Sequence, residues 1–251
     1  MLLQDFVTEI HNYAGILRAI AHGYRTPKEI ATSSGLNDRH ISMYLSNLAE
    51  TGFVERRVPI TDPPSSRKGR HHITDPFLRF YYRFLSQRQA QLALGVQDQA
   101  LIEIKKHLTD FIGTHTWEEL CREWLIRASG KNILPFLPDQ TGSIWNRDAQ
   151  IDVAGINNME KTLYLGECKW NRQKIGVAVL KKLIEKTEMV LPKNGAWKVF
   201  YLGFARRGWT EPAIQFVQTE AAKSGGKRWQ AAGILLRTLD QVDEELQEWT
   251  A

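Results

Sequence analysis

The sequence is poor in cysteine and in long apolar runs, and both shortages narrow the class of protein. Its 251 residues contain two cysteines, Cys121 and Cys168, and neither lies in a CxxC pair. A disulfide scaffold and a cysteine-based zinc site are therefore excluded. No apolar stretch approaches the roughly 20 residues that a membrane-spanning helix needs. The first ten residues, MLLQDFVTEI, hold two acids and no basic residue. We therefore expect no secretory signal, a cytoplasmic protein and no membrane partner.

The chain also lacks a GxxxxGK(S/T) loop, so ATP hydrolysis is not expected. With 43% hydrophobic and 24% charged residues, the chain can bury a core and is not intrinsically disordered. Its positive charge is concentrated: residues 55–88 hold eight Lys or Arg and three acids, a net charge of +5 that equals that of the whole chain. Such a region suits a long phosphate backbone such as DNA, and ordinary solvated surface is the alternative.

Three helices followed by a two-stranded hairpin are expected in the first 75 residues. Apolar residues recur at helical spacing in the first and third helices, and Thr26 followed by Pro27 is a typical helix start. A tight turn at Gly35 separates the second helix from the third, as in a helix-turn-helix. The predicted helices cover residues 10–22, 27–35 and 38–50, and the predicted strands cover residues 53–60 and 71–75 on either side of a Pro/Ser/Gly-rich loop.

This order of elements resembles the winged-helix family. The resemblance implies that the third helix enters the major groove of DNA while the loop touches phosphates or the minor groove. Winged helices also serve as protein-docking modules, and Arg39 is the one strong base reader on the third helix, so both roles stay open. The residues expected to contact DNA are Arg39, His40, Ser42 and Asn47 on the helix and Arg67, Lys68 and Arg70 in the loop.

Residues 76–112 are expected to form a helical linker. Large apolar side chains such as Phe77, Phe80, Tyr81 and Phe84 recur there at helical spacing. This density predicts a helix that packs into a core, and stacking of the rings on single-stranded bases is the alternative.

The strongest chemical signal lies in two neighbouring strands of the second half. In the first, Ile151 and Val153 alternate with Asp152, which places Asp152 on the opposite face from the two aliphatic residues. In the second, Glu167 and Lys169 share a face because strand periodicity is two. The turn-type sequence NNMEK joins the strands, so an antiparallel hairpin is expected.

The position of this turn predicts the register of the hairpin. If it centres between residues 159 and 160, paired positions sum to 319 and Asp152 lies opposite Glu167, with Cβ atoms about 4.5–5.5 Å apart. Two carboxylates at that distance repel each other, and Mg²⁺ or Mn²⁺ bound by both would remove the conflict. Lys169, on the same side, can stabilise a developing phosphorane or orient the attacking water. A surface Asp152 beside a structural Glu167–Lys169 ion pair is the alternative.

IDVAG followed by LYLGECKW resembles the PD-(D/E)xK nuclease superfamily. The resemblance implies an α/β (α+β) restriction-endonuclease-like fold with a mixed central sheet, in which helix 174–190 crosses over to the strand WKVFYLGF. It assigns Asp152 to the first acid of the motif and Glu167 and Lys169 to ExK, although Ile151 stands where the motif has proline. Glu118, on helix 114–128, resembles the acid that archaeal Holliday-junction resolvases add to their metal site.

The whole chain resembles the C-terminal region of archaeal-type P-loop ATPases, without the ATPase domain. The markers are ITDPFLRFYYRF, THTWEELCREWL and the run from WNRDAQIDV to GECKW. The resemblance implies a winged helix at 1–75, a linker at 76–112 and a nuclease-like domain at 113–251, with DNA and a P-loop ATPase domain or subunit as partners.

We therefore expect a DNA-binding nuclease that hydrolyses phosphodiester bonds with Mg²⁺ or Mn²⁺. Its catalytic residues would be Asp152, Glu167, Lys169 and Glu118, with Asp152 and Glu167 holding the metal. A non-catalytic DNA-binding or regulatory module that partners an ATPase is one alternative, and a protein-interaction module is another. The oligomeric state stays open, a homodimer included.

Overall fold

The chain forms two units, and each unit is made of two separate segments of the sequence. The computed structural model describes residues 2–219 and 225–250, with side chains from residue 9 onward. The first unit comprises residues 1–58 and 66–108, and the second comprises residues 59–65 and 109–251. Residues 76–108, most of the expected linker, therefore group with the N-terminal unit.

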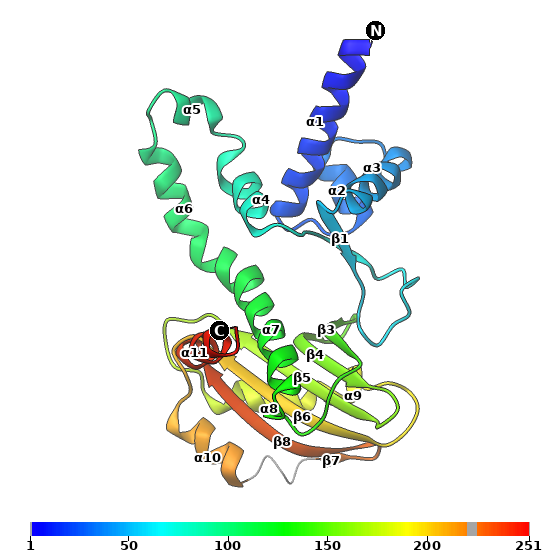
Figure 1. Cartoon of the computed structure of the whole chain (residues 1–251), viewed down its shortest axis with the longest axis vertical. Coiled ribbons are helices and arrows are strands. Elements are labelled where there is room, and N and C mark those ends of the chain that lie inside the picture. Colours follow the sequence, from blue (N-terminus) through cyan, green and yellow to red (C-terminus); the bar gives the residue numbers. More distant parts are fainter. Residues whose placement is uncertain (1, 220–224, 251) are drawn as a thin grey trace. The chain divides into compact units, whose positions relative to one another are not determined.

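The first unit begins with three helices and a two-stranded sheet (Figure 1). The helices are α1 (Leu2–Ala21), α2 (Pro27–Ser34) and α3 (Asp38–Glu50), and the strands are β1 (Val54–Arg57) and β2 (Arg70–Ile73). The strands pair antiparallel, from Val54 with Ile73 to Arg57 with Arg70. These elements are those expected from the sequence, except that α1 begins eight residues earlier than residue 10 and β1 ends at Arg57 rather than at residue 60.

Local capping explains where the helices of this unit begin and end. The hydroxyl of Thr26 accepts the N–H of Glu29, and the Glu29 carboxylate accepts the N–H of Thr26 at 2.9 Å, so the two form a capping box. Gly35 ends α2 with φ of +72°, a conformation that glycine adopts without strain. Asn37 then caps α3 by accepting the N–H of Arg39 at 2.9 Å.

The second part of this unit is helical, but its buried face differs from the expected one. Phe84 is 2% exposed, whereas Phe77 is 68% exposed and Arg79 is buried instead. The predicted packing into a core therefore holds for Phe84 and Leu78 but not for Phe77. A π-helix begins at Tyr81 and contains Phe84, and its wider turn departs from the 3.6-residue period assumed for the segment. The elements are α4 (Pro76–Phe80), the π-helix η1 (Tyr81–Leu85), α5 (Gln89–Ala93) and α6 (Asp98–Phe111).

The second unit is built on a mixed six-stranded sheet with the order β3-β4-β5-β6-β8-β7. The first three strands in this order pair antiparallel, and β5, β6 and β8 pair parallel. The predicted hairpin and the predicted crossover from β5 to β6 are therefore confirmed. The strands are β3 (Gln140–Trp145), β4 (Gln150–Asn157), β5 (Thr162–Lys169), β6 (Trp197–Ala205), β7 (Gly225–Gly226) and β8 (Trp229–Thr238).

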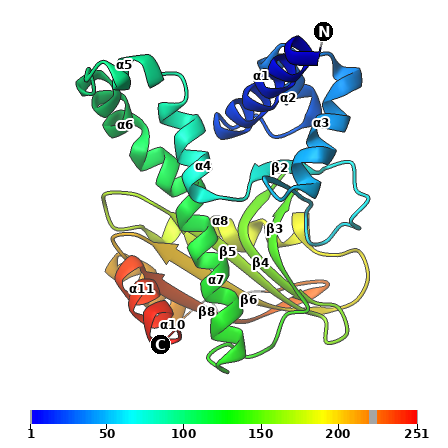
Figure 2. The same cartoon turned by 45° about the horizontal axis from the view of Figure 1, so that its top comes forward.

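Helices cover both faces of this sheet. Figure 2 shows α7 crossing one face, where Trp117 and Trp124 pack with Val153 and Tyr164, and α11 adds Val242 to the same core. On the other face, α8 packs against the sheet's second core. The helices are the π-helix η2 (Ile112–Thr116), α7 (Trp117–Gly130), α8 (Val177–Glu185), α9 (Thr187–Val190), α10 (Glu211–Thr219) and α11 (Leu239–Glu248).

Residues 59–65, which connect β1 to β2, belong to the second unit by their contacts. Ile60 packs against the core on the α8 side of the sheet, and its N–H donates to the Ser143 carbonyl at 3.2 Å. Gly142 leaves room for this contact, because a Cβ there would lie 2.6 Å from the Ile60 Cγ2. None of the described helices combines the length and the apolar character that crossing a membrane requires.

Candidate functional site

Asp152 and Glu167 meet across the β4–β5 hairpin. The strands pair Val153 with Gly166 and Ala154 with Leu165, so paired positions sum to 319 as predicted. The last pair is Val153 with Gly166, and the same register extended by one position sets Asp152 opposite Glu167, whose charge acts on Asp152. The carboxylates therefore lie on neighbouring strands at the end of β5 where the chain leaves the sheet.

A β-bulge in β4 lies at Asp152, and the sequence did not reveal it. Between two regular pairs with β3, Asp152 and Val153 together oppose the single residue Ser143, and a bulge of this kind redirects side chains. Ile151 consequently packs into the core on the α8 side, while Val153 packs on the α7 side. The prediction that Ile151 and Val153 share a face is therefore wrong. The flanking pairs are Gly142 with Ala154 and Ile144 with Ile151.

The bulge is fixed by hydrogen bonds to Asp152. Its backbone carbonyl accepts the Ser143 hydroxyl at 2.7 Å and the Arg122 guanidinium at 3.2 Å. Its side-chain Oδ2 accepts the backbone N–H of Cys168 at 3.0 Å, beyond the last paired residues of the hairpin. The Asp152 carboxylate is thus held beside the ExK segment rather than pointing freely into solvent.

Glu167 lies between two lysines. It is 9% exposed, and Lys169 Nζ donates to its Oε1. Lys186 Nζ donates to its Oε2 at 2.7 Å and to the Gln150 carbonyl at 2.9 Å. Sequence reasoning missed Lys186, which follows α8 and ties this helix to both strands of the hairpin. Its only sequence signal is a basic residue inside the predicted crossover helix, which does not reveal where the side chain reaches.

The surroundings push the pKa values of the two acids apart. Burial, and then the charge of Glu167, raise the pKa of Asp152 despite the Cys168 N–H and the two lysines. Burial would also raise the pKa of Glu167, but hydrogen bonds from Lys169 and Lys186 outweigh it and lower that pKa. The pKa of Lys169 is raised because Glu167 outweighs the effect of burial. Divergent pKa values in adjacent carboxyl groups are typical of functional sites.

Glu118 lies on α7, as expected, and its carboxylate is 3.9 Å from the Arg122 guanidinium. Its charge contributes to raising the pKa of Cys121 and of Cys168, so it lies near the same end of the sheet. Burial is the main cause of the raised pKa of both thiols, and it makes these cysteines poor nucleophiles.

The two carboxylates suit a hard divalent cation with water or phosphate as further ligands. Among the described residues, no group of three or more His, Cys, Asp or Glu side chains is arranged to hold a metal ion. Mg²⁺ is usually held by one or two carboxylates and keeps several waters, so Asp152 and Glu167 fit that requirement. Asp152 Oδ2 already accepts the N–H of Cys168, and its remaining lone pairs could coordinate a cation. At Glu167 a cation would have to displace one of the two lysines.

In the N-terminal unit, three of the four residues expected on the DNA-reading helix lie open on α3. Arg39, His40 and Ser42 are exposed. Asn47 is also exposed, but its amide donates to the Tyr13 hydroxyl at 2.8 Å, so it is partly committed to α1.

Of the three loop residues expected to contact DNA, two are exposed and one is half-buried. Arg67 and Lys68 are exposed, and the Lys68 N–H donates to the Ser66 hydroxyl at 3.2 Å within the loop. Arg70 is half-buried and paired in β2 with Arg57. Its charge also contributes to lowering the pKa of Glu29, after the larger effect of the Thr26 N–H.

Comparison with protein families places most of this site inside a matched segment. Residues 81–183 match the DUF234 family, described as "Archaea bacterial proteins of unknown function". The matched segment, less than half of the chain, includes Glu118, Asp152, Glu167 and Lys169 and ends before Lys186.

A curated relative extends the similarity without adding an activity. The uncharacterized protein MJECL04 of Methanocaldococcus jannaschii is 35% identical over 158 residues, which are 63% of this chain and 35% of the relative. The chain thus spans about a third of the length of the curated relative it matches.

Among solved structures, the O-methyltransferase NcsB1 from neocarzinostatin biosynthesis, in complex with S-adenosyl-L-homocysteine, is 17% identical. The match covers 94% of this chain and 69% of that chain, with a TM-score of 0.24. A second structure of the same enzyme, with S-adenosylmethionine and 2-hydroxy-5-methyl naphthoic acid, is 16% identical over 95% and 67% of the two chains, also with a TM-score of 0.24. These scores carry no argument about fold or activity.

Proposed function

We propose that this chain is a metal-dependent DNA nuclease of the PD-(D/E)xK type, joined to a winged helix that binds duplex DNA. The observation that carries the proposal is the opposition of Asp152 and Glu167 across a bulged hairpin, with Lys169 bonded to Glu167. Two adjacent, partly buried carboxylates repel each other and raise the free energy of the folded state, a cost that a bound cation would remove.

Each residue has a role that follows from its position. Asp152 and Glu167 would hold Mg²⁺ or Mn²⁺, which when bound would polarise the phosphate and lower the pKa of a water molecule. Lys169 would turn from Glu167 toward the phosphate and stabilise the negative charge that develops there. Glu118 would orient water from α7. The bulge holds the Asp152 carboxylate in place through Ser143 and Cys168.

The winged-helix part of the proposal rests on the exposed cations of the first unit. Arg39 at the start of α3 and Arg67 and Lys68 in the loop after β1 are exposed. Arg39 would contact bases in the major groove, and Arg67 and Lys68 would contact phosphates.

A second candidate function is a non-catalytic DNA-binding or regulatory module that partners a P-loop ATPase. The observation that favours it is the closed state of Glu167, since both of its oxygens accept an ammonium group. A site that worked only as a structural ion-pair network would look the same. The relative's greater length leaves room for a further domain on that protein.

Cleavage of supercoiled, linear, single-stranded and branched DNA with Mg²⁺, Mn²⁺ or EDTA separates the two functions. We expect metal-dependent cleavage that falls at least about 100-fold in Asp152→Ala and in Lys169→Ala. The matched controls are Glu160→Gln in the turn of the same hairpin and Lys198→Ala on β6, both exposed. Absence of cleavage on every substrate, with DNA affinity unchanged in the variants, would leave the regulatory function as the better conclusion.

DNA binding is tested separately by the salt dependence of affinity. Arg67→Ala should weaken binding to all sequences and reduce the slope of log K against log salt by about 1, since one phosphate contact is lost. Lys198→Ala should leave the slope unchanged. Equal slopes in all three proteins would remove the loop from the DNA-binding surface.

A further inference from the structure

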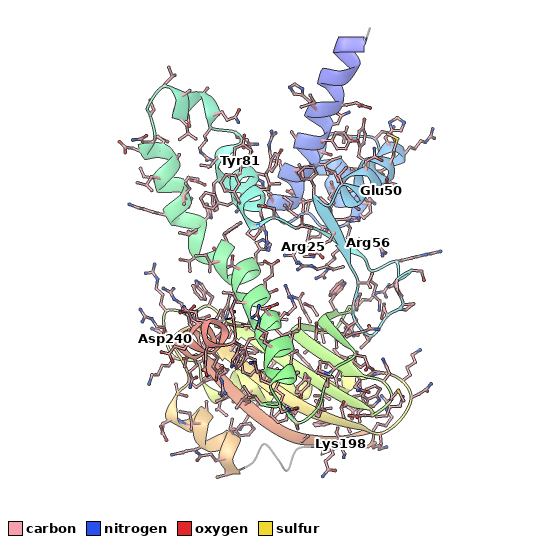
Figure 3. The ribbon with its side chains drawn as sticks, in the orientation of Figure 1. Arg25, Glu50, Arg56, Tyr81, Lys198 and Asp240 are labelled. Atoms are coloured by element: carbon pink, nitrogen blue, oxygen red, sulfur yellow. The ribbon has the colours of Figure 1, made fainter. Side chains whose placement is uncertain are left out.

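The N-terminal unit contains a pocket that neither DNA binding nor catalysis explains. Its volume is about 390 Å³, within the range of about 300–1,000 Å³ that is usual for small-molecule sites. It lies among α1, the end of α3 and the α4–η1 segment; Glu50 on α3 and Tyr81 on η1 are labelled in Figure 3. The lining residues are Tyr13, Leu17, Asn47, Leu48, Thr51, Phe53, Leu78 and Tyr82.

The walls of the pocket are apolar and aromatic. Leu17 and Leu48 are buried lining residues, and Tyr13, Phe53 and Tyr82 add aromatic rings to the lining. Phe53 is 45% exposed. None of the described lining residues is charged, so a ligand with a net charge would gain no counter-ion from them.

A few polar groups at fixed positions would orient a ligand in the pocket. The Asn47 amide donates to the Tyr13 hydroxyl at 2.8 Å, so that hydroxyl keeps its own hydrogen for another acceptor. The Thr51 hydroxyl donates to the Asn47 carbonyl at 2.7 Å, which fixes the end of α3. Burial raises the pKa of Tyr82, so its phenol stays neutral and able to donate. Two phenol donors beside aromatic walls suit a flat molecule that carries a hydrogen-bond acceptor.

We propose that this pocket binds a small, uncharged aromatic molecule with a carbonyl or similar acceptor. The shape argues against a protein partner, because a stable protein interface buries about 800 Å² on each side and is not a concavity of this size. Three lining residues, Asn47, Leu48 and Thr51, lie on α3 or at its end. Occupancy therefore changes the surroundings of the helix that carries Arg39 and His40.

The probe for this test is 6-propionyl-2-dimethylaminonaphthalene, a neutral aromatic ketone whose fluorescence shifts to shorter wavelength in apolar surroundings. Titration into the full chain should give saturable binding of one probe per chain. Thr51→Phe places a ring in the pocket from the capping position of α3, and Tyr82→Phe removes one donor. We expect affinity to fall at least tenfold in the first variant and severalfold in the second. The matched control is Met43→Ala, which removes an apolar side chain that is 52% exposed on α3 and does not line the pocket.

Three results would overturn the proposal. The first is the absence of saturable binding to the wild-type chain. The second is an equal loss of binding in Met43→Ala and Thr51→Phe, which would indicate adsorption to exposed apolar surface. The third is a wild-type dimer that Thr51→Phe converts to a monomer, which would assign the pocket to a second copy of this chain. Circular dichroism of each variant separates loss of the pocket from loss of the fold.

Discussion

Replacing Lys186 by methionine tests directly how much the lysine stabilises the negative charge of Glu167 beside Asp152. Lys186 is 17% exposed at its side chain and bonds both Glu167 Oε2 and the Gln150 carbonyl. Methionine keeps the length and apolar stem of the side chain and removes the charge. Glu167 then keeps Lys169 as its one ammonium partner, and Gln150 loses a donor.

The expected loss of stability follows from these contacts. Removing one partner of a buried ion pair destabilises a protein by about 3–5 kcal/mol. Because Lys169 remains and the site is partly solvated, we expect about 1–3 kcal/mol for Lys186→Met. With a urea dependence of about 1–3 kcal/mol per molar, the unfolding midpoint should fall by roughly 1 M. Lys182→Met, at an exposed position on α8, should change the free energy of unfolding by less than about 0.5 kcal/mol.

Tryptophan fluorescence is suited to this assay because it reports on one unit alone. All eight tryptophans lie between residues 109 and 251, in the second unit. The change in the free energy of unfolding can therefore be read without a contribution from the first unit.

Adding Mg²⁺ should have the opposite effect on stability to that of removing Lys186. Loss of Lys186 leaves Glu167 Oε2 open to a cation, so Mg²⁺ should restore more stability to Lys186→Met than it adds to the wild type. Equal effects of Mg²⁺ on the two proteins, or a variant as stable as the wild type without metal, would refute this account of the site.

Three further changes test other parts of the structure. Asp152→Asn keeps an acceptor for the Cys168 N–H but removes the repulsion with Glu167, so it should raise the free energy of unfolding near pH 7 by roughly 1 kcal/mol while abolishing cleavage; a less stable variant would contradict this. The pKa of Asp152 is raised in the folded state, so its contribution to the free energy of unfolding is lost as pH rises through that raised pKa. The pKa of Glu167 is lowered, so its contribution to the free energy of unfolding is lost as pH falls through that lowered pKa. Urea titrations at several pH values should show that Asp152→Asn removes the first of these pH dependences and keeps the second. Gly203→Ala should destabilise the second unit by about 1–3 kcal/mol, because the new Cβ would lie 2.6 Å from atoms of Leu236 and Trp209. Unfolding followed by tryptophan fluorescence measures this loss, and an unchanged free energy of unfolding would contradict it. Thr26→Ala should lower the stability of the first unit by about 1 kcal/mol through loss of the capping box, measured by circular dichroism against Thr26→Ser, which should lose much less.

The features that the sequence predicted correctly are governed by neighbours in the chain. The capping box needs Thr26 and Glu29 three residues apart, and the register of the hairpin follows from the turn between β4 and β5. The opposition of Asp152 and Glu167 could be predicted for the same reason, since a short turn fixes which positions face each other.

The features that it missed depend on partners distant in the chain. The bulge at Asp152 arises from the pairing of β3 with β4, in which Ser143 lies opposite both Asp152 and Val153. Lys186 reaches Glu167 because of the way α8 packs on the sheet. Neither pairing leaves a periodic signal in the sequence. In the first unit, the sequence also did not reveal the π-helix η1 or the exposure of Phe77.

The assignment of residues 59–65 to the second unit has a consequence for the order of folding. The strands β1 and β2 and the three helices before them depend on local contacts, which form quickly and can form while the chain is being synthesised. Ile60 sits in the loop of that same hairpin, but its partner Ser143 is translated much later. The nascent first unit therefore presents an apolar loop that stays unsatisfied until β3 exists. Closing this long-range contact belongs to the late, slow part of folding, and a chain truncated before β3 should expose Ile60 to chaperones and proteases.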